Sequence, residues 1–234
     1  MDNLDWSFGA VAFIDVLGFS SFVGNDAKTT DPKNLLKLRS ILMGVKDAAP
    51  DLDVRAFSDS IVVSTDLESK SVTRLLVTVL NLQRHFINGG FLIRGGVAFG
   101  KHYADETIIY SEALIRAYEL ERDKARFPRV LVANDLIDWY FHNSETLKSD
   151  VEIVQSALLT DRDGLNFIDY LDENLILKHL ETINAYQINK ATPSVLEKIQ
   201  WLCQYHNFSA DRLGSPAKYD GPMLTGFHPI NIKP

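Results

Sequence analysis

Residues 9–19 read Gly-Ala-Val-Ala-Phe-Ile-Asp-Val-Leu-Gly-Phe, and this stretch decides the fold. Its first part, residues 9–14, is a nearly continuous apolar run, which is typical of a strand buried on both faces. The run ends at Asp15, and residues 16–22 predict a turn into a helix. An acidic residue directly after a strand is usually a turn residue or a helix cap, so Asp15 alone does not identify a functional site.

A second acidic residue stands between two β-rich segments. Residues 53–57 and 61–64 favour strands, and Ser58-Asp59-Ser60 separates them. This pattern predicts a hairpin with Asp59 at its tip. Around it we expect helices at 32–48 (capped by Asp31, with Pro32 at the first helical position), 68–87 and 111–124, and strands at 91–100 and 129–133.

The order of these elements is the β-α-β-β-α-β arrangement of ferredoxin-like sheets. It predicts an α+β fold in which helices pack on one face of a largely antiparallel sheet. After residue 134 the pattern loosens, with helices expected at 173–188 and 193–206 and an irregular tail from 214. We therefore expect a catalytic domain over residues 1–145, and a C-terminal helical elaboration over 146–234 packed on the same domain.

Composition excludes several classes of function. The chain has 234 residues and a formal net charge of −7, which argues against a nucleic-acid surface because such surfaces need clustered cations. The single cysteine, Cys203, excludes an internal disulfide and suits a reducing compartment. The apolar stretches 8–14 and 75–82 are too short to span a bilayer, and the N-terminus lacks a basic leader region. We expect a cytoplasmic protein without membrane contact.

In the predicted topology, the first strand and the hairpin are neighbours, so Asp15 and Asp59 can converge. Paired carboxylates hold the divalent cations that phosphoryl chemistry uses. Gly18 and Phe19 follow at a strand-to-helix turn, where free backbone N–H groups suit phosphate oxygens. The sequence thus predicts a metal-dependent site that acts on a phosphorylated substrate.

These residues resemble a known family. Residues 13–19 resemble the first metal motif of class III adenylate and guanylate cyclases, and residues 57–60 resemble the second, with Ser58 where most members carry glycine. Residues 93–100 look like the strand that follows, and the resemblance covers roughly residues 10–133. It implies catalysis by Asp15 and Asp59, which with the Val16 carbonyl would hold two cations, and a homodimer with shared active sites.

At several positions the sequence differs from most members of that family, and these differences point to one group within it. Arg55 stands where purine cyclases carry a base-reading lysine, and Ile108 stands where its aspartate partner is found. Ile115 and Glu119 replace the usual transition-state asparagine and arginine. With these changes, the sequence is similar to the bacterial pyrimidine cyclases of the Pycsar anti-phage systems. That likeness implies Mn²⁺ (with Mg²⁺ as the alternative cation) and a cyclic product that activates a separate effector during phage infection.

We expect conversion of UTP to 3′,5′-cyclic UMP and pyrophosphate, with Arg55 reading the base because its planar donors fit a pyrimidine carbonyl. Gly18 and Phe19 would hold phosphates. Arg116 would reach them across the dimer, unless it forms an ordinary helical pair with Glu112. The alternatives are a cytidylate cyclase acting on CTP, a purine cyclase, and a catalytically silent module that only dimerises or senses nucleotide. Lys124, Arg126 and Arg129 are further cationic candidates.

Overall fold

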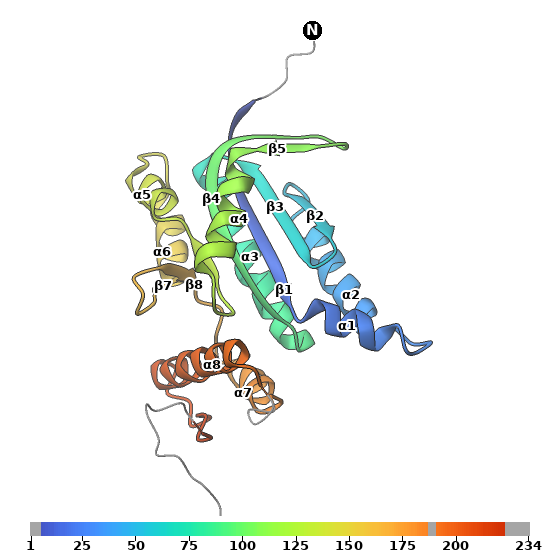
Figure 1. Cartoon of the computed structure of the whole chain (residues 1–234). Coiled ribbons are helices and arrows are strands. Elements are labelled where there is room, and N and C mark those ends of the chain that lie inside the picture. Colours follow the sequence, from blue (N-terminus) through green and yellow to red (C-terminus); the bar gives the residue numbers. More distant parts are fainter. Residues whose placement is uncertain (1–5, 187–190, 223–234) are drawn as a thin grey trace, which may run out of the picture. The chain divides into compact units, whose positions relative to one another are not determined.

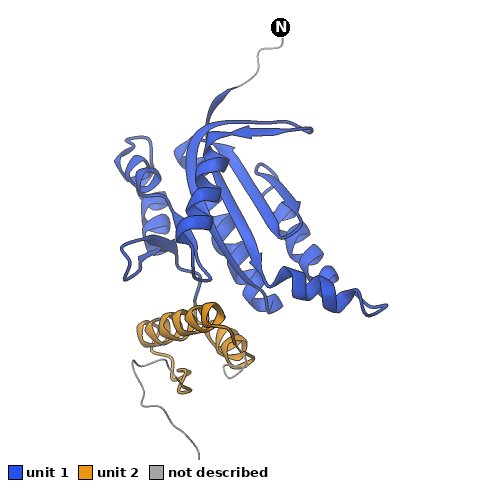
Figure 2. Ribbon diagram, viewed as in Figure 1, with its two compact units in different colours: residues 1–171 blue, residues 172–234 orange. Residues whose placement is uncertain are grey.

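A computed structural model of the chain describes residues 6–186 and 191–222 (Figure 1). It divides into two compact units, residues 1–171 and 172–234 (Figure 2). The elements of the first unit are β1 (Ser7–Leu17), α1 (Phe19–Asp26), α2 (Lys33–Ala48), β2 (Asp53–Phe57), β3 (Ser60–Asp66), α3 (Ser69–Gly89), β4 (Leu92–Ala104), β5 (Ile109–Ser111), α4 (Glu112–Lys124), β6 (Val130–Val132), α5 (Asn134–His142), α6 (Lys148–Ser156), β7 (Leu158–Thr160) and β8 (Asn166–Ile168). The second unit contains α7 (Ile176–Asn184) and α8 (Pro193–Arg212).

The first unit is built on one sheet with the strand order β2-β3-β1-β4-β6-β8-β7, and β5 extends β4 as a hairpin. All pairs are antiparallel except β4 with β6. β1 is central, and its register sets Asp15 opposite Ser60 of β3 on one side and opposite Arg94 of β4 on the other. The predicted α+β class with a largely antiparallel sheet is confirmed.

Helices cover both faces of this sheet, so the prediction of a single covered face is wrong. Ile14 and Val16 of β1 belong to a core cluster that includes the buried side of α3. Phe13 points the other way and packs edge-on against Tyr118 of α4, with 5.3 Å between ring centroids. Gly96 of β4 permits this second layer, since a Cβ there would lie 2.5 Å from the Ala117 carbonyl oxygen. In Figure 1, α4 crosses in front of the sheet and α3 behind it.

Several predicted elements form with shifted ends. β1 continues to Leu17, so Asp15 lies within the strand rather than after it. The expected capping of α2 by Asp31 is wrong, because Pro32 occupies the cap position without a side-chain hydrogen bond. The Asp26 carboxylate instead accepts the Leu35 amide (2.9 Å) and the Asn34 side-chain amide (2.8 Å) at the start of α2. A cap supplied by another helix leaves no local sequence signal.

The chain after residue 134 contains more structure than its pattern indicates. Helices α5 and α6 are followed by the short strands β7 and β8, and β8 joins the sheet through Phe167, opposite Leu131. Strands of three residues are too short to show alternation. The first compact unit therefore continues past the division predicted at residue 145. The predicted helix 193–206 forms and extends to Arg212, and that over 173–188 forms only as Ile176–Asn184, its last two residues lying outside the described part. No helix in the described ranges is long and apolar enough to cross a membrane.

The second unit encloses a stacked pair of histidines. His179 of α7 and His206 of α8 are both fully buried, and their Nδ1 atoms are 3.1 Å apart. Nε2 of His206 donates to the Ala217 carbonyl (2.7 Å), so its Nδ1 must accept the proton of His179. Burial, reinforced by His206, lowers the pKa of His179 to about 3, and burial also lowers the pKa of His206.

This pair should make the second unit sensitive to acid. Because both folded-state pKa values lie below the unfolded value, the neutral pair stabilises the fold above about pH 6.5 and the unfolded chain gains protons first as the pH falls. The lowered pKa of His179 alone should reduce the free energy of unfolding by about 2 kcal/mol as the pH falls from 6.5 to 5. Amide hydrogen exchange in α7 and α8 will measure this loss. His179→Gln should flatten this pH dependence, whereas the exposed His142→Gln should leave it unchanged. An equal slope in the His179 variant would contradict the assignment.

Candidate active site

Asp15 and Asp59 are brought to neighbouring positions by β1 and the β2–β3 hairpin. Asp59 occupies the two-residue tip between Phe57 and Ser60, and its carbonyl oxygen accepts the Val16 amide at 2.9 Å. The contact ties the hairpin tip to the residue that follows Asp15. Ser58, the other tip residue, has a φ of 56°, a left-handed conformation that favours glycine. The hairpin thus accepts local strain at the position where the resemblance expects glycine.

An arginine that the sequence did not single out as functional contacts Asp15. Nε of Arg94 lies 3.1 Å from Asp15 Oδ2, and Nη2 lies 2.7 Å from Oε1 of Glu121 on α4. Glu121 is 3% exposed, and burial raises its pKa while Arg94 acts in the opposite direction. Glu121 lies on the buried side of α4, at the same four-residue spacing as Ala113 and Ala117. This spacing is the sequence signal that would have located it. Asp15 is therefore part of a charge network that spans β1, β4 and α4.

The chemistry of the donors is suited to a hard divalent cation. Two carboxylates with a nearby backbone carbonyl match Mg²⁺ and Mn²⁺, which take one or two carboxylates and complete their coordination with water and substrate phosphates. Among the described residues, no group of three or more His, Cys, Asp or Glu side chains gathers as a metal cage. Asp15 and Asp59 would thus bind metal together with a phosphorylated substrate rather than alone, and the Asp15 carboxylate would exchange its contact with Arg94 for the cation.

Gly18 and Phe19 form the corner between β1 and α1. Gly18 has a φ of 78° and occupies the cap position of α1 without a side-chain cap. Its carbonyl accepts the amides of Ser21 and Phe22, which closes the first turn. The two amides that precede these in the first turn, those of Phe19 and Ser20, have no acceptor within the helix, so they suit an anion. The Phe19 side chain lies in a pocket between α1 and α2, so only its backbone amide would be available to a phosphate.

Arg55 lies on β2 and is oriented by an ion pair. Its Nε and Nη2 each lie 2.8 Å from Oδ2 of Asp53, two residues earlier on the same strand. Arg55 also contributes to the lowered pKa of Asp105, after the larger effects of hydrogen bonds from the Ile108 amide, the Tyr103 hydroxyl and the Thr107 amide. The guanidinium is therefore within electrostatic range of the turn that holds Ile108. Arg55 and Ile108 are among the positions at which the sequence departs from purine cyclases, and Asp105, which Arg55 influences, accepts the Ile108 amide.

Arg116 is directed away from these residues. It donates to the Phe99 carbonyl (2.7 Å) and to the Asp135 carboxylate (2.5 Å) at the start of α5. The alternative pairing with Glu112 does not form, because the Glu112 carboxylate accepts the Lys101 amide (3.0 Å). Arg116 can reach phosphate only by leaving these partners. Its neighbour Ile115 is 59% exposed on the outer side of α4.

The other cationic candidates differ in their surroundings. Arg129 is fully buried and bound to the carboxylates of Asp161 and Asp163, so it stabilises the region between β6 and β8. Lys124 and Glu119 line an open pocket of about 480 Å³ beside α4, whose wall is part polar and part apolar. Arg126 lies in the loop between α4 and β6.

Comparisons with known proteins identify the fold. No protein-family model matches the chain, and no curated protein matches its sequence. Among solved structures, the adenylyl cyclase CyaB from P. aeruginosa matches with a TM-score of 0.50 and 12% identity, over 74% of this chain and 99% of that chain. A guanylyl cyclase domain of a RhoGC fusion protein from Blastocladiella emersonii matches with a TM-score of 0.48 and 15% identity, over 69% and 94%. The chain has the fold of class III nucleotide cyclase catalytic domains.

Proposed function

We propose that the protein is a metal-dependent uridylate cyclase, which converts UTP to 3′,5′-cyclic UMP and pyrophosphate. The observation that carries this proposal is the hydrogen bond of 2.9 Å between the Val16 amide and the Asp59 carbonyl, which joins the hairpin tip that bears Asp59 to the strand that bears Asp15. Because the fold is that of nucleotide cyclases, we interpret Asp15 and Asp59 as the residues that bind the catalytic metal ions.

The chain's own residues divide the work of the reaction. Asp15, Asp59 and the Val16 carbonyl hold the cations, and the amides at Gly18 and Phe19 bind phosphate oxygens. Two bound Mn²⁺ or Mg²⁺ ions would supply the positive charge that activates the ribose 3′-hydroxyl and neutralises the leaving pyrophosphate. Arg94 keeps Asp15 oriented before substrate arrives. Ile115 and Glu119 cannot serve as the usual transition-state pair, so the metals carry a larger share of the stabilisation.

Base selection is assigned to Arg55 and Ile108. A guanidinium offers planar donors to a pyrimidine carbonyl, whereas Ile108 offers no acceptor for the adenine amino group. The orientation of Arg55 by Asp53 supports this assignment, because a fixed guanidinium discriminates better than a free one. Uracil is favoured over cytosine by the resemblance to uridylate cyclases; the cytidylate cyclase is the nearest alternative, and a purine cyclase follows it.

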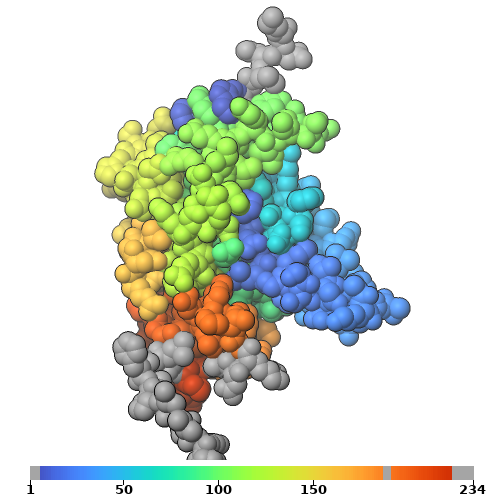
Figure 3. All heavy atoms as spheres, viewed as in Figure 1, coloured from blue at the N-terminus to red at the C-terminus, as the bar shows by residue number. Residues whose placement is uncertain are grey.

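A homodimer with shared active sites fits the exposed apolar residues of the first unit. Several of these residues lie on the β4–β5 hairpin, on α4 and just before β1, and they are Trp6, Ile108, Tyr110, Ile115 and Tyr118, each at least 41% exposed. The green surface in Figure 3 belongs to this hairpin and to α4. Exposed aromatic side chains in such numbers are typical of protein interfaces. In such a dimer, each active site would be completed by residues of both protomers.

The biological role follows from the same resemblance. The cyclic nucleotide would act in the cytoplasm on a separate effector, as the second messenger of an anti-phage defence system of the Pycsar type. Neither nucleic acid nor a membrane is needed for the reaction.

The decisive experiment incubates the full chain with UTP, CTP, ATP and GTP in separate reactions with Mn²⁺. Chromatography and mass spectrometry then identify any cyclic product. Cyclic UMP with release of pyrophosphate is the expected result. Cyclic CMP or a cyclic purine nucleotide would move the assignment to the corresponding alternative, and the absence of any cyclic product would overturn it.

Arg55→Ala should weaken discrimination among bases more than it weakens metal binding. We expect the kcat/KM ratio of UTP to ATP to fall about tenfold or more, since a bidentate contact to a base contributes about 1–3 kcal/mol to discrimination. The affinity for Mn²⁺, measured by electron paramagnetic resonance, should stay within about twofold because Arg55 is not a metal ligand. Arg55→Lys is the matched control: it keeps the charge but loses the planar fork, so it should recover little selectivity. Full selectivity in Arg55→Ala would refute this role.

A catalytically silent, nucleotide-sensing module is the second candidate. The contact between Arg94 and Asp15 favours it, because it satisfies one metal carboxylate without metal. Exposed Ile115 and Glu119 at the usual catalytic positions also favour it. Such a module would bind UTP or another triphosphate in calorimetry and yield no pyrophosphate.

A further inference from the structure

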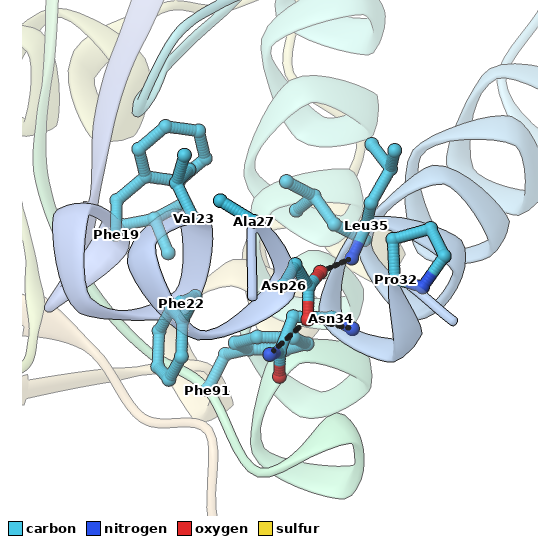
Figure 4. Close-up of a pocket in the computed structure, with 11 residues that line it drawn as sticks. Phe19, Phe22, Val23, Asp26, Ala27, Pro32, Asn34, Leu35 and Phe91 are labelled. Carbon is cyan, nitrogen blue, oxygen red and sulfur yellow. Dashed lines mark hydrogen bonds between the residues drawn. The ribbon is translucent and has the colours of Figure 1, made fainter. Parts of the chain in front are cut away.

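A pocket lies between α1, α2 and the end of the sheet (Figure 4). Val16 faces this pocket, and successive residues of a strand point to opposite faces, so Asp15 and the pocket are separated by the thickness of the sheet. Phe91 forms its floor and packs edge-on against Phe22, with 5.0 Å between ring centroids. The pocket is therefore distinct from the proposed substrate site.

The size and lining of this pocket indicate its ligand. Its volume is about 380 Å³, within the range of small-molecule sites. The lining is formed by aromatic, aliphatic and proline side chains with two polar residues, Asp26 and Asn34. Asp26 is the one charged residue of the lining, so an anion would be repelled and a donor group would be favoured.

The Asp26 carboxylate is ionised and has capacity left for a ligand. Partial burial would raise its pKa, but hydrogen bonds from the Leu35 amide and from Asn34 outweigh this effect and lower the pKa. Oδ1 accepts from Asn34, and Oδ2 accepts the Leu35 amide at 2.9 Å. An ionised carboxylate has about four acceptor positions, so a further N–H or O–H group can bind there.

The pocket is connected to the candidate active site through two residues. Val16 contributes its side chain to the pocket wall and its amide to the hydrogen bond that holds Asp59. Phe19 contributes its ring to the pocket and follows Gly18 at the phosphate-binding corner. A ligand that shifts either side chain moves the backbone next to Asp15 and Asp59.

We infer that this pocket is a regulatory site for an uncharged small molecule with an aromatic or branched aliphatic body and one N–H or O–H donor. The binding site itself stands on the pocket, whereas its regulatory effect rests on the proposed function of Asp15 and Asp59. A ligand of this class occupies the apolar volume, places its donor on Asp26, and changes the geometry of the metal carboxylates through Val16.

The test uses N-phenyl-1-naphthylamine, an uncharged fluorescent dye with two aromatic groups and one N–H, titrated into the full chain. We expect saturable binding with one site per chain. Val23→Trp fills the pocket from α1 and should weaken binding about tenfold or more, whereas Asn25→Trp, an exposed position of α1 outside the lining, should leave it within about twofold. Unsaturable fluorescence, or equal affinity in the two variants, would overturn the site.

Two further measurements test the donor and the regulation. Displacement by 1-phenylnaphthalene, which lacks the N–H, should require about tenfold more ligand, and equal potency would remove the role of Asp26. Mn²⁺ should shift the dye affinity about fivefold or more, and Asp59→Asn should abolish this shift; no shift in the unaltered chain would overturn the regulatory link. Because dye binding needs no nucleotide, failure of the pocket and failure of the cyclase assignment are observed separately.

Discussion

Asp59→Asn should reduce cyclic nucleotide formation about 10³-fold or more, with little change in stability. The substitution removes the charge that we propose binds metal, and a rate loss of that size corresponds to about 4 kcal/mol of transition-state stabilisation. The fold should tolerate the change because Asp59 is held to β1 through its backbone carbonyl, which asparagine retains. Turnover by pyrophosphate release and thermal unfolding of the same preparation measure the two effects.

Asp66→Asn provides the matched control for this experiment. Asp66 is exposed at the far end of β3, opposite Gly9, so the variant makes the same charge change on the same strand away from the site. Its turnover and its affinity for Mn²⁺ should equal those of the unaltered chain. Full activity in Asp59→Asn would refute the assignment of Asp59 as a metal ligand, regardless of the turnover measured for Asp66→Asn.

Arg94→Leu should destabilise the first unit by about 3 kcal/mol, the largest stability effect that we expect near the site. It leaves Glu121 buried on α4 without its ion-pair partner, and an uncompensated buried charge is costly. The double variant Arg94→Leu/Glu121→Leu removes the stranded charge and should recover most of the loss. Urea unfolding of both variants gives the two free energies.

The exposed pair of Arg122 and Asp123 serves as the comparison. Both side chains are about half exposed, at 51% and 52%, so Arg122→Leu should cost no more than about 1 kcal/mol. Equal losses for Arg94→Leu and Arg122→Leu would contradict the buried network. The double variant should also lose activity while remaining folded, because Asp15 no longer has the donor at 3.1 Å that orients it.

Much of the framework could be predicted from the sequence because it depends on local patterns. The apolar run at 9–14, the hairpin around Asp59 and the start of α4 at Ser111 each follow from neighbours within a few residues. The Ser111 hydroxyl accepts the Leu114 amide at 3.0 Å, which is the local capping geometry that the pattern implies. Three-residue strands such as β7 and β8 carry no such periodicity, so they were missed.

The partners of the functional side chains could not be predicted in the same way. Arg94 is 79 positions from Asp15, and its second carboxylate, Glu121, comes from a helix that the sequence assigned to no particular face. The sequence predicts Arg116 either at a phosphate across the dimer or beside Glu112; within the chain it pairs with Asp135 of α5 and not with Glu112. Such pairings depend on how elements distant in the chain pack, and a single sequence contains no direct record of that packing.

By itself the sequence determined that one acidic residue follows a buried apolar run and that another lies at a hairpin tip, because apolar runs and turn composition are local properties. Only the tertiary structure decided what surrounds them. The register of β1 with β3 and β4 placed Asp59 against Val16 and Arg94 against Asp15. Packing of α4 on one face of the sheet buried Glu121 beside Arg94, and packing of α1 and α2 on the other left a pocket behind Val16. The physical reason is that burial and charge pairing depend on contacts between distant segments, which exist only once the chain has folded.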